Sequence, residues 1–456
     1  MKKILLFVAA AAFLFQFANA QIFVAETATG ANDGTSWANA YTDLQVAIHL
    51  ATSGDTIWVA VGTYKPSIDT LGVFPNDVER RSFWLKNGVV LYGGFLGTET
   101  SLSQRDPVYN KATLNGEITT GVFAEHVINV YAHIDTTAVM DGFVVENGYS
   151  SNTSTEKNGS GMILRGDAYF TNMLFRNNTT YNQGGAIYAE GSNSRFVACN
   201  FTNNKTIQYD GGAANFVYSN IKMYNCVFWI NQATRFGGAI TTVESDLLVQ
   251  NGTFAGNIGG SNVFQFSTSG TISLNNCIFT DDNTAPAVLG SSGAVANFRE
   301  SLMPQSNSWL ILCQTCWGGA ATFVMPGIGD FQLMSGSMGI DDTLATTPVN
   351  PYLDIIGNPR SIGYSMDLGA YEFQGNVSIE MPQSQLDLTV YPNPTSEFLM
   401  VQINEPIENI AIYNMTGQKV LSAMGNRISV ASLTAGMYLI EIQTEGGKAA
   451  TRFVKE

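Results

Sequence analysis

The sequence is poor in the residues from which most enzyme sites are built. Only 13% of its 456 residues are charged, it has three histidines and five cysteines, and acidic residues outnumber basic ones by 37 to 22. Five cysteines over this length exclude a fold built on disulfides. The net charge of −15 opposes binding to nucleic acids and to anionic lipids. It also does not favour strongly acidic polymers such as pectate without a metal ion.

Motifs that carry chemistry are missing as well. The sequence contains no nucleophile motif, phosphate-binding loop or metal signature. His49, His126 and His133 are not grouped with residues that would make them general bases. Hydrolysis of a glycosidic bond requires two facing carboxylates, and Glu190 and Glu244, the nearest to an aligned pair, are one residue out of register. We therefore expect no cofactor and no metal ion.

A long apolar run occurs only at the N-terminus. A positively charged start precedes it, and small residues follow at 18–20. This pattern predicts a signal peptide over residues 1–20, cleaved between Ala20 and Gln21. No later stretch has the roughly 20 apolar residues that a membrane-spanning helix needs. The mature chain is therefore expected to be exported and to have no transmembrane segment.

The most prominent feature of the chain is a repeat. Each copy has a phenylalanine, followed three residues later by an asparagine or, in the last copy, by Asp282, and a Gly-Gly pair separates successive copies; the phenylalanines are Phe175, Phe201, Phe228, Phe254 and Phe279. A period in the twenties without helical periodicity is typical of a solenoid, in which each repeat forms one turn. We predict an all-β fold, a right-handed parallel β-helix with regular coils at about 139–283. Equivalent residues would stack at the strand spacing of roughly 4.8 Å.

These stacked positions predict ladders. The phenylalanines are expected to fill the interior, and the asparagines, with Asp282 in the last copy, to lie at turns where stacked amides bond to one another. Three cysteines share the position two residues before the phenylalanine, and we interpret them as small buried apolar residues rather than ligands or disulfides: Cys199, Cys226 and Cys277. After the Gly-Gly pairs, Ile187, Ala214 and Ile240 are expected to point inward and Tyr188, Asn215 and Thr241 outward.

One segment near the N-terminus has helical periodicity. Leu44, Ala47, Ile48 and Ala51 fall on one face of a helix over residues 42–53. Thr42 and Gln45 match a capping box. Because the open end of a β-helix exposes unpaired backbone and core, an amphipathic helix before the first strands predicts an N-terminal cap.

Several segments resemble one group of proteins. Residues 35–45, 54–59, 82–95 and 140–145, together with the Gly-Gly repeats, are similar to secreted Bacteroidetes proteins with pectin-lyase-like β-helices and repeats like those of polymorphic outer-membrane proteins. Residues 367–372, Asp-Leu-Gly-Ala-Tyr-Glu, resemble the motif that closes such a β-helix. The resemblance covers most of residues 25–373 and implies the fold and export. It implies no single activity, because this fold hosts lyases, hydrolases and adhesins.

The composition changes after a polar linker at 374–387. Residues 388–456 have alternating apolar positions that predict a small β-sandwich, following the β-helix domain of residues 21–373. This region resembles the type A C-terminal sorting domain of the type IX secretion system; the matching residues are Tyr391, Pro392, Asn393, Pro394, Gly417, Gly436, Tyr438 and Lys455. The resemblance implies that the type IX machinery carries the chain across the outer membrane and that the domain is removed. Release or attachment to surface lipopolysaccharide would follow. A β-sandwich binding module is the alternative.

A few residues are candidates for a site. Asp210 and Arg235 lie beside neighbouring Gly-Gly turns and could face one groove, and Asp282 is a third catalytic candidate that also simply continues the asparagine ladder. Three aromatic residues in the same turn region suit stacking on sugars, with ordinary turn packing as the alternative: Tyr181, Tyr209 and Phe236. Cys313 and Cys316 form a single CxxC, for which a local disulfide is favoured over a metal site.

These observations leave two main functional hypotheses. The first is a secreted or surface-displayed β-helix that binds a polysaccharide or a host surface as an adhesin, without catalysis. The second is a polysaccharide lyase or glycoside hydrolase on the pectin-lyase-like scaffold. A purely structural role in a surface layer is a third possibility. A cleft with converging acids and a base would favour the enzyme, and a flat face would favour the binding protein.

Overall fold

The structure is a computed structural model. It describes residues 20–68, 77–260, 264–267, 269–280, 288–290, 295–303, 313–314, 316–342, 353–360, 365–375, 388–414, 419–434, 436–444 and 447–456. The chain separates into two compact units, residues 1–373 and 374–456. Most of the predicted signal peptide, together with Asp282 and Gly417, lies outside the described residues.

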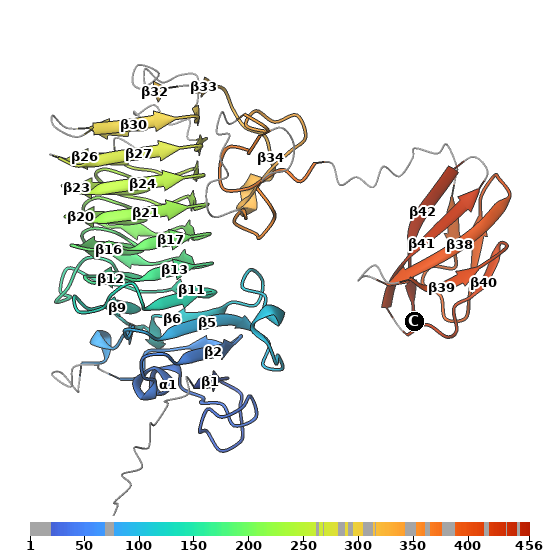
Figure 1. Ribbon diagram of the computed structural model, residues 1–456, viewed down its shortest axis with the longest axis horizontal. Coiled ribbons are helices and arrows are strands. Elements are labelled where there is room, and N and C mark those ends of the chain that lie inside the picture. Colours follow the sequence, from blue (N-terminus) through green and yellow to red (C-terminus); the bar gives the residue numbers. More distant parts are fainter. Residues whose placement is uncertain are drawn as a thin grey trace, which may run out of the picture. The chain divides into compact units, whose positions relative to one another are not determined.

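The first unit is a parallel β-helix whose strands stack in chain order (Figure 1). Most coils contribute one strand to each of three sheets, which we call sheets A, B and C. Sheet A contains β1 (Gln21–Val24), β2 (Thr56–Ala60), β5 (Val90–Phe95), β10 (Val139–Asp141), β13 (Tyr169–Thr171), β17 (Arg195–Val197), β21 (Asn220–Tyr224), β24 (Asp246–Gln250), β27 (Thr271–Asn275), β30 (Val295–Arg299) and β32 (Cys313–Gln314).

Sheets B and C complete each coil. Sheet B contains β3 (Thr63–Tyr64), β6 (Ala112–Asn115), β11 (Phe143–Glu146), β14 (Leu174–Arg176), β18 (Asn200–Thr202), β22 (Val227–Trp229), β25 (Thr253–Ala255), β28 (Ile278–Phe279), β31 (Leu302–Met303) and β33 (Trp317–Gly318). Sheet C contains β4 (Phe83–Trp84), β9 (Ile128–Val130), β12 (Met162–Leu164), β16 (Ile187–Glu190), β20 (Ala214–Val217), β23 (Ile240–Val243), β26 (Phe264–Ser267) and β29 (Val288–Gly290).

The interior is organised by the predicted phenylalanine ladder. From Phe175 to Phe279 the five repeat phenylalanines are buried and pair in register along sheet B, with ring centroids 4.8–5.1 Å apart and nearly parallel planes. Cys199, Cys226 and Cys277 are free thiols buried beside this ladder, as interpreted from the sequence. Burial raises the pKa of Cys277 to about 12, so this thiol is unreactive.

The asparagine ladder fills the turn between sheets B and C. The side-chain amides of Asn178, Asn204, Asn231 and Asn257 are buried, and each of the first three donates from Nδ2 to Oδ1 of the next at 2.9–3.0 Å. Each Nδ2 also donates to a backbone carbonyl, such as Phe175 O from Asn204 at 2.9 Å. The ladder asparagines do not adopt the left-handed backbone conformation. Residues directly before them do, such as Asn177 and Asn203. The amides therefore act through hydrogen bonds rather than through backbone conformation.

The N-terminal helix is shorter than predicted. Helix α1 spans Leu44–Leu50, and the predicted apolar face, with Leu44, Ala47 and Ile48, is buried against the first coils. The predicted capping box is wrong, because Asp43 is the N-cap and accepts from Gln45 N at 2.8 Å. The side chain of Gln45 is instead buried and donates to Ser82 O at 2.8 Å. It thus joins the helix to the segment that precedes β4.

After β33, the described residues within 319–342, 353–360 and 365–373 lie against the outer face of sheet B rather than continuing the coils. They include β34 (Phe323–Met325), the turn η4 (Pro326–Ile328) and β35 (Asp330–Leu333), and Figure 1 shows β34 beside the stack of strands. The 367–372 motif is bound there, with Gly369 N donating to Asn276 O at 2.8 Å and Ala370 N to Thr253 Oγ1 at 2.9 Å. Arg360 is buried behind it and donates to Asp367 O and Gly369 O.

The second unit is a β-sandwich. Its three-stranded sheet contains β36 (Thr389–Tyr391), β37 (Phe398–Gln402) and β40 (Arg427–Ser429); its four-stranded sheet contains β39 (Lys419–Ala423), β38 (Ile407–Asn414), β41 (Gly436–Thr444) and β42 (Gly447–Lys455). The two sheets share one apolar core that includes Leu399, Ile428, Ile412 and Ile440. The alternation of apolar residues in the sequence predicted this sandwich.

Candidate functional site

The structure brings Asp210 and Arg235 together. Both lie between the asparagine ladder and the Gly-Gly pairs, in a surface strip that we call the turn edge: residues 179–183, 205–210 and 232–236 of three successive coils. Arg235 donates from Nε to Asp210 Oδ1 at 2.9 Å and from Nη2 to Oδ2 at 2.6 Å. Phe236 N adds a third bond to Oδ1 at 3.2 Å. The carboxylate of Asp210 is buried, whereas the Arg235 side chain is 50% exposed.

The aromatic residues of the turn edge are paired with cations. The Arg235 guanidinium lies 5.1 Å from the ring centre of Tyr209 and 5.2 Å from that of Phe236. One coil earlier, the Lys157 ammonium lies 5.8 Å from the ring centre of Tyr181. All three rings are half-buried. The strip therefore presents ring surfaces and cations on successive coils, with Tyr181, Tyr209 and Phe236 standing three, two and one residues before the Gly-Gly pair of their coil.

This arrangement suits binding better than acid–base chemistry. The hydrogen bonds that Arg235 donates to Asp210 raise the pKa of Arg235, so the guanidinium does not release a proton to act as a base. Both oxygens of Asp210 are occupied by Arg235 and Phe236 N. The two residues that the sequence singled out as catalytic candidates thus form one fixed ion pair. The third candidate, Asp282, lies outside the described residues.

Sequence reasoning missed a second polar cluster, on the outer face of sheet A. Arg105 donates to Asp141 Oδ2 at 2.5 Å, and Asn172 Nδ2 donates to the other oxygen at 2.8 Å. Lys111 Nζ donates to Asn172 O at 2.7 Å and to Pro107 O. Burial lowers the pKa of Lys111 to about 8. No spacing signal could have found this cluster, because its members come from different coils and a loop.

The same face of sheet A has further cations and rings. Arg195 lies over the ring of Tyr224, with 4.5 Å between the guanidinium carbon and the ring centre. Lys222 is the in-register neighbour of Arg195 on the next coil and is exposed, and Tyr169 precedes Arg195 in the same row. These residues leave a mixed basic and aromatic strip beside the Arg105 cluster.

Among the described residues, no group of three or more His, Cys, Asp or Glu side chains could hold a metal ion. His126 is buried, and its Nδ1 donates to Gly159 O at 3.0 Å. Desolvation by burial lowers its pKa to about 4, so it is neutral near pH 7. Cys316 is disulfide-bonded. The side chain of Cys313 lies outside the described part of the chain, so the pairing of Cys313 with Cys316 stays a prediction.

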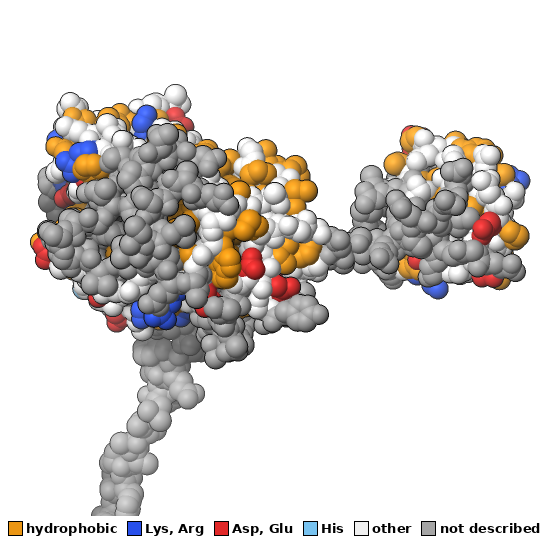
Figure 2. Space-filling view, turned by 90° about the horizontal axis from the view of Figure 1, so that it is seen from above, with side chains coloured by type: hydrophobic (Ala, Val, Ile, Leu, Met, Phe, Trp, Pro, Cys, Tyr) orange, Lys and Arg blue, Asp and Glu red, His pale blue; other side chains and the backbone are white. Residues whose placement is uncertain are grey.

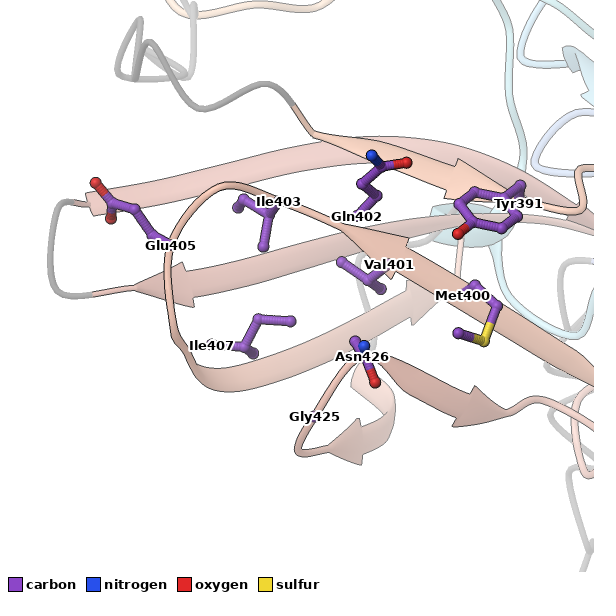
Figure 3. A pocket seen from close by; sticks show the side chains of 9 residues that line it. All are labelled: Tyr391, Met400, Val401, Gln402, Ile403, Glu405, Ile407, Gly425 and Asn426. Carbon is purple, nitrogen blue, oxygen red and sulfur yellow. The ribbon is translucent and has the colours of Figure 1, made fainter.

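Each unit has a hollow among its described residues. One, of about 580 Å³, lies at the N-terminal coils and is lined by Trp37, Val61, Leu96 and small residues. The other, of about 470 Å³, lies in the second unit and is lined by residues of β36 and β37, by the segment that leads into β38 and by the loop before β40. Figure 3 shows Ile403 and Ile407 on either side of that pocket, with Gly425 and Asn426 entering from the loop before β40.

Hydrophobic side chains gather on the segment around β34. Figure 2 shows them on the projecting side of the β-helix unit. The exposed residues of this patch are Val324, Met325, Ile328, Met334 and Met338. Exposed apolar patches of this kind mark contact surfaces in many proteins, and the sequence pattern did not single this one out.

The residues of the second unit that resemble a sorting motif are joined to one another and to the last strand by hydrogen bonds and ring contacts. Asn393 Oδ1 accepts from Val454 N at 2.8 Å, so the Tyr391–Pro394 segment is joined to the last strand. Tyr438 donates from its hydroxyl to Thr434 O at 2.8 Å and stacks on Phe453. Gly436 begins β41, and Lys455 is buried at the end of β42. Gly417 lies outside the described residues.

Comparisons with known proteins agree with this architecture. Residues 141–300 match the family described as "Right handed beta helix region", and residues 389–456 match "Secretion system C-terminal sorting domain". Among solved structures, the chain is similar to one described as "Crystal structure of pectate lyase Pel9A", with 14% identity, a TM-score of 0.47, and coverage of 78% of this chain and 97% of that one. A search of the curated proteins finds no match. No helix in the described residues is long and apolar enough to cross a membrane.

Proposed function

Because the chain is a right-handed parallel β-helix protein with a C-terminal sorting domain of the type IX secretion system, which directs it to the cell surface or out of the cell, we propose that it binds a polysaccharide through its turn edge and does not cleave it. The observation that carries this proposal is Arg235. Its guanidinium is fixed by Asp210, lies against two aromatic rings and remains half exposed.

The physical argument rests on preorganisation. An arginine that is already held by a carboxylate and two rings loses little conformational freedom when it contacts a ligand. Aromatic rings offer the apolar face that a pyranose ring stacks on. Tyr181, Tyr209 and Phe236 come from three consecutive coils, so an extended sugar chain along the helix axis would meet one ring after another. The exposed Lys205, on the coil of Tyr209, adds a further hydrogen-bond donor.

The test uses the full secreted chain and a panel of insoluble and soluble plant, algal and host polysaccharides. Retention on one polysaccharide class is expected, and Tyr209→Ala and Phe236→Ala are each expected to weaken it at least tenfold. The matched control is Tyr218→Ala, because Tyr218 is 59% exposed on a different turn. Equal weakening by the control, or no weakening by the turn-edge variants, would contradict the proposal.

A second candidate function is a polysaccharide lyase, and Lys111 is the observation that favours it. A lysine whose pKa is lowered to about 8 by burial is closer to a general base than Arg235 is. Its ammonium is bonded to two backbone carbonyls, however, and both bonds stabilise the protonated form. New unsaturated ends that disappear in Lys111→Gln would support the lyase, and Lys111→Arg, which keeps the charge without the lowered pKa, is the control.

For maturation, we propose that residues 1–20 are removed as a signal peptide before Gln21 and that the sorting domain is cut off within 374–387. Attachment to surface lipopolysaccharide would then retain the β-helix at the cell surface as an adhesin. Terminal sequencing and mass measurement of the exported protein test both cuts. A mature chain that begins elsewhere, or that still contains residues 388–456, would contradict this proposal.

A further inference from the structure

The hollow at the first coils, which we call the N-terminal pocket, has the features of a binding site of its own. It measures about 580 Å³, within the range of small-molecule sites. Its lining includes Thr27, Thr29, Trp37, Ala38, Val61 and Leu96. We propose that this pocket binds an uncharged sugar residue, separately from the turn edge.

The indole that lines the pocket is rigidly held. Its ring lies 4.8 Å from that of Phe23 and 5.5 Å from that of Phe95, both measured between centres. Trp37 Nε1 donates to Glu99 O at 2.8 Å. Trp37 is nevertheless only half-buried. A fixed and partly open indole is the platform on which the apolar face of a sugar ring stacks.

Two carboxylates, those of Glu99 and Glu26, hold the loops that form the walls by accepting hydrogen bonds from backbone amides. Glu99 accepts from the backbone of Leu96 at 2.7 Å, of Thr98 at 2.9 Å and of Gly97 at 3.0 Å. Glu26 accepts from Thr63 N at 2.9 Å and so holds the turn that follows Val61. The pocket is therefore already formed without ligand, which lowers the entropic cost of binding.

The lining defines the chemical class of the ligand. Among the described residues, no charged side chain lines the pocket, and burying a charged group without a partner is costly. Thr27 and Thr29 supply hydroxyls that can bond to sugar hydroxyls. Val61 and Leu96, 49% and 61% exposed, supply an aliphatic rim. A neutral hexose fits this combination, and a 6-deoxyhexose fits it best because its methyl group would contact the aliphatic rim.

The test is saturation-transfer NMR and calorimetry on the full chain with the methyl glycosides of rhamnose, fucose, glucose, galactose and galacturonic acid. Neutral glycosides are expected to bind, the 6-deoxyhexosides most tightly, and the galacturonide at least tenfold more weakly. Ala38→Trp, which fills the pocket from an exposed position, is expected to abolish binding. Ala132→Trp, at an exposed turn elsewhere, is the matched control and is expected to have no effect.

Trp37→Ala removes the stacking surface but also contacts with Phe23 and Phe95, so it is accompanied by Trp37→Phe, which is expected to keep part of the affinity. Tyr209→Ala is expected to leave binding of these glycosides unchanged, so failure here and failure of the turn-edge proposal are distinguishable. The inference is overturned if no neutral glycoside binds, if the galacturonide binds equally well, or if Ala38→Trp binds as the unmodified chain does.

Discussion

The inside and the outside of the same coils follow different rules. Inside, Phe175, Phe201 and Phe228 repeat one residue in one geometry. Outside, at the turn edge of those coils, the pairs of cation and ring differ: Lys157 lies over Tyr181, whereas Arg235 lies beside Tyr209 and Phe236. A stacked fold needs apolar side chains that pack together where each coil meets its neighbour, and sheet B meets this need with one residue type. Variation is therefore most informative where the coils do not pack on one another.

The largest expected effect is a break in the interior ladder. Phe228 lies 4.8 Å from both Phe201 and Phe254, measured between ring centres. Phe228→Ala is expected to lower the free energy of unfolding by about 3–5 kcal/mol, because it leaves a cavity between the two rings. Chemical denaturation measures the loss, and Phe228→Leu, which fills most of the space, is expected to cost less. A loss below about 1 kcal/mol for the alanine variant would contradict the packing account.

The next largest effect is expected in the amide ladder. Asn204 donates to Asn231 Oδ1 and to Phe175 O, and its Oδ1 accepts from the backbone and side chain of Asn178. Asn204→Ala removes all four bonds, so a loss of about 3 kcal/mol is expected at roughly 1 kcal/mol for each bond, less some relaxation. Asn193→Ala, at an exposed position, is the control for the same measurement. Equal losses for the two variants would refute the ladder's role.

A buried group outside the ladders gives a pH-dependent effect. The pKa of His126 is about 4 in the folded chain, below its ordinary 6.5. The unfolded chain therefore binds more protons, and stability falls as the pH drops from 6.5 towards 4, by at most about 3 kcal/mol. Asp367 acts in the opposite sense, because burial raises its pKa to about 6. The free-energy cost of its buried negative charge is relieved as the carboxylate takes up a proton, so its contribution to stability increases as the pH falls through 6.

Denaturation midpoints between pH 7 and pH 4 test this prediction. His126→Asn is expected to remove the acid-induced loss that the histidine causes, whereas His133→Asn, at an exposed position, is not. If His126→Asn loses as much stability on acidification as the unmodified chain, the histidine is not the group responsible.

The smallest effect on stability is expected at the turn edge. Tyr209 is half-buried and lies outside both ladders, so Tyr209→Ala is expected to change the free energy of unfolding by less than about 1 kcal/mol. Its effect on polysaccharide retention is expected to be at least tenfold. Thermal unfolding and retention, measured on the same preparation, separate the two. If Tyr209→Ala unfolds at a clearly lower temperature and also binds poorly, Tyr209 stabilises the fold and the prediction is contradicted.

The features that follow from the spacing of the repeat could be predicted from the sequence. Equal spacing of phenylalanines and asparagines predicts both ladders, because stacking makes in-register positions neighbours. It did not predict that Asn215 and Thr241, outward on sheet C, would be buried. Asn215 Nδ2 donates to Thr241 Oγ1 at 2.5 Å, and the Gly-Gly turns approach Thr241 so closely that a Cβ on Gly211 would lie 2.8 Å from its hydroxyl.

Contacts between distant segments could not be read from spacing either. Ala370 reaches Thr253 across 117 residues, and Lys111 reaches the carbonyl of Asn172 across 61. One partner in each contact is a backbone group, the amide of Ala370 or the carbonyl of Asn172, and a backbone group has no signature in the sequence, so neither contact could be predicted. For the candidate site, spacing predicted that Asp210 and Arg235 could share one groove. Their ion pair, which opposes a catalytic role, could not be predicted, because it depends on the rotamers of both side chains.

The most direct test of the central claim is one assay of the full chain on a polysaccharide that retains it. Bound protein and new reducing or unsaturated ends are measured in the same sample over time. The account predicts retention that depends on Tyr209 and Phe236 and no increase in chain ends above the level without protein. A steady increase in ends that Lys111→Gln abolishes would contradict it and would identify the protein as a lyase.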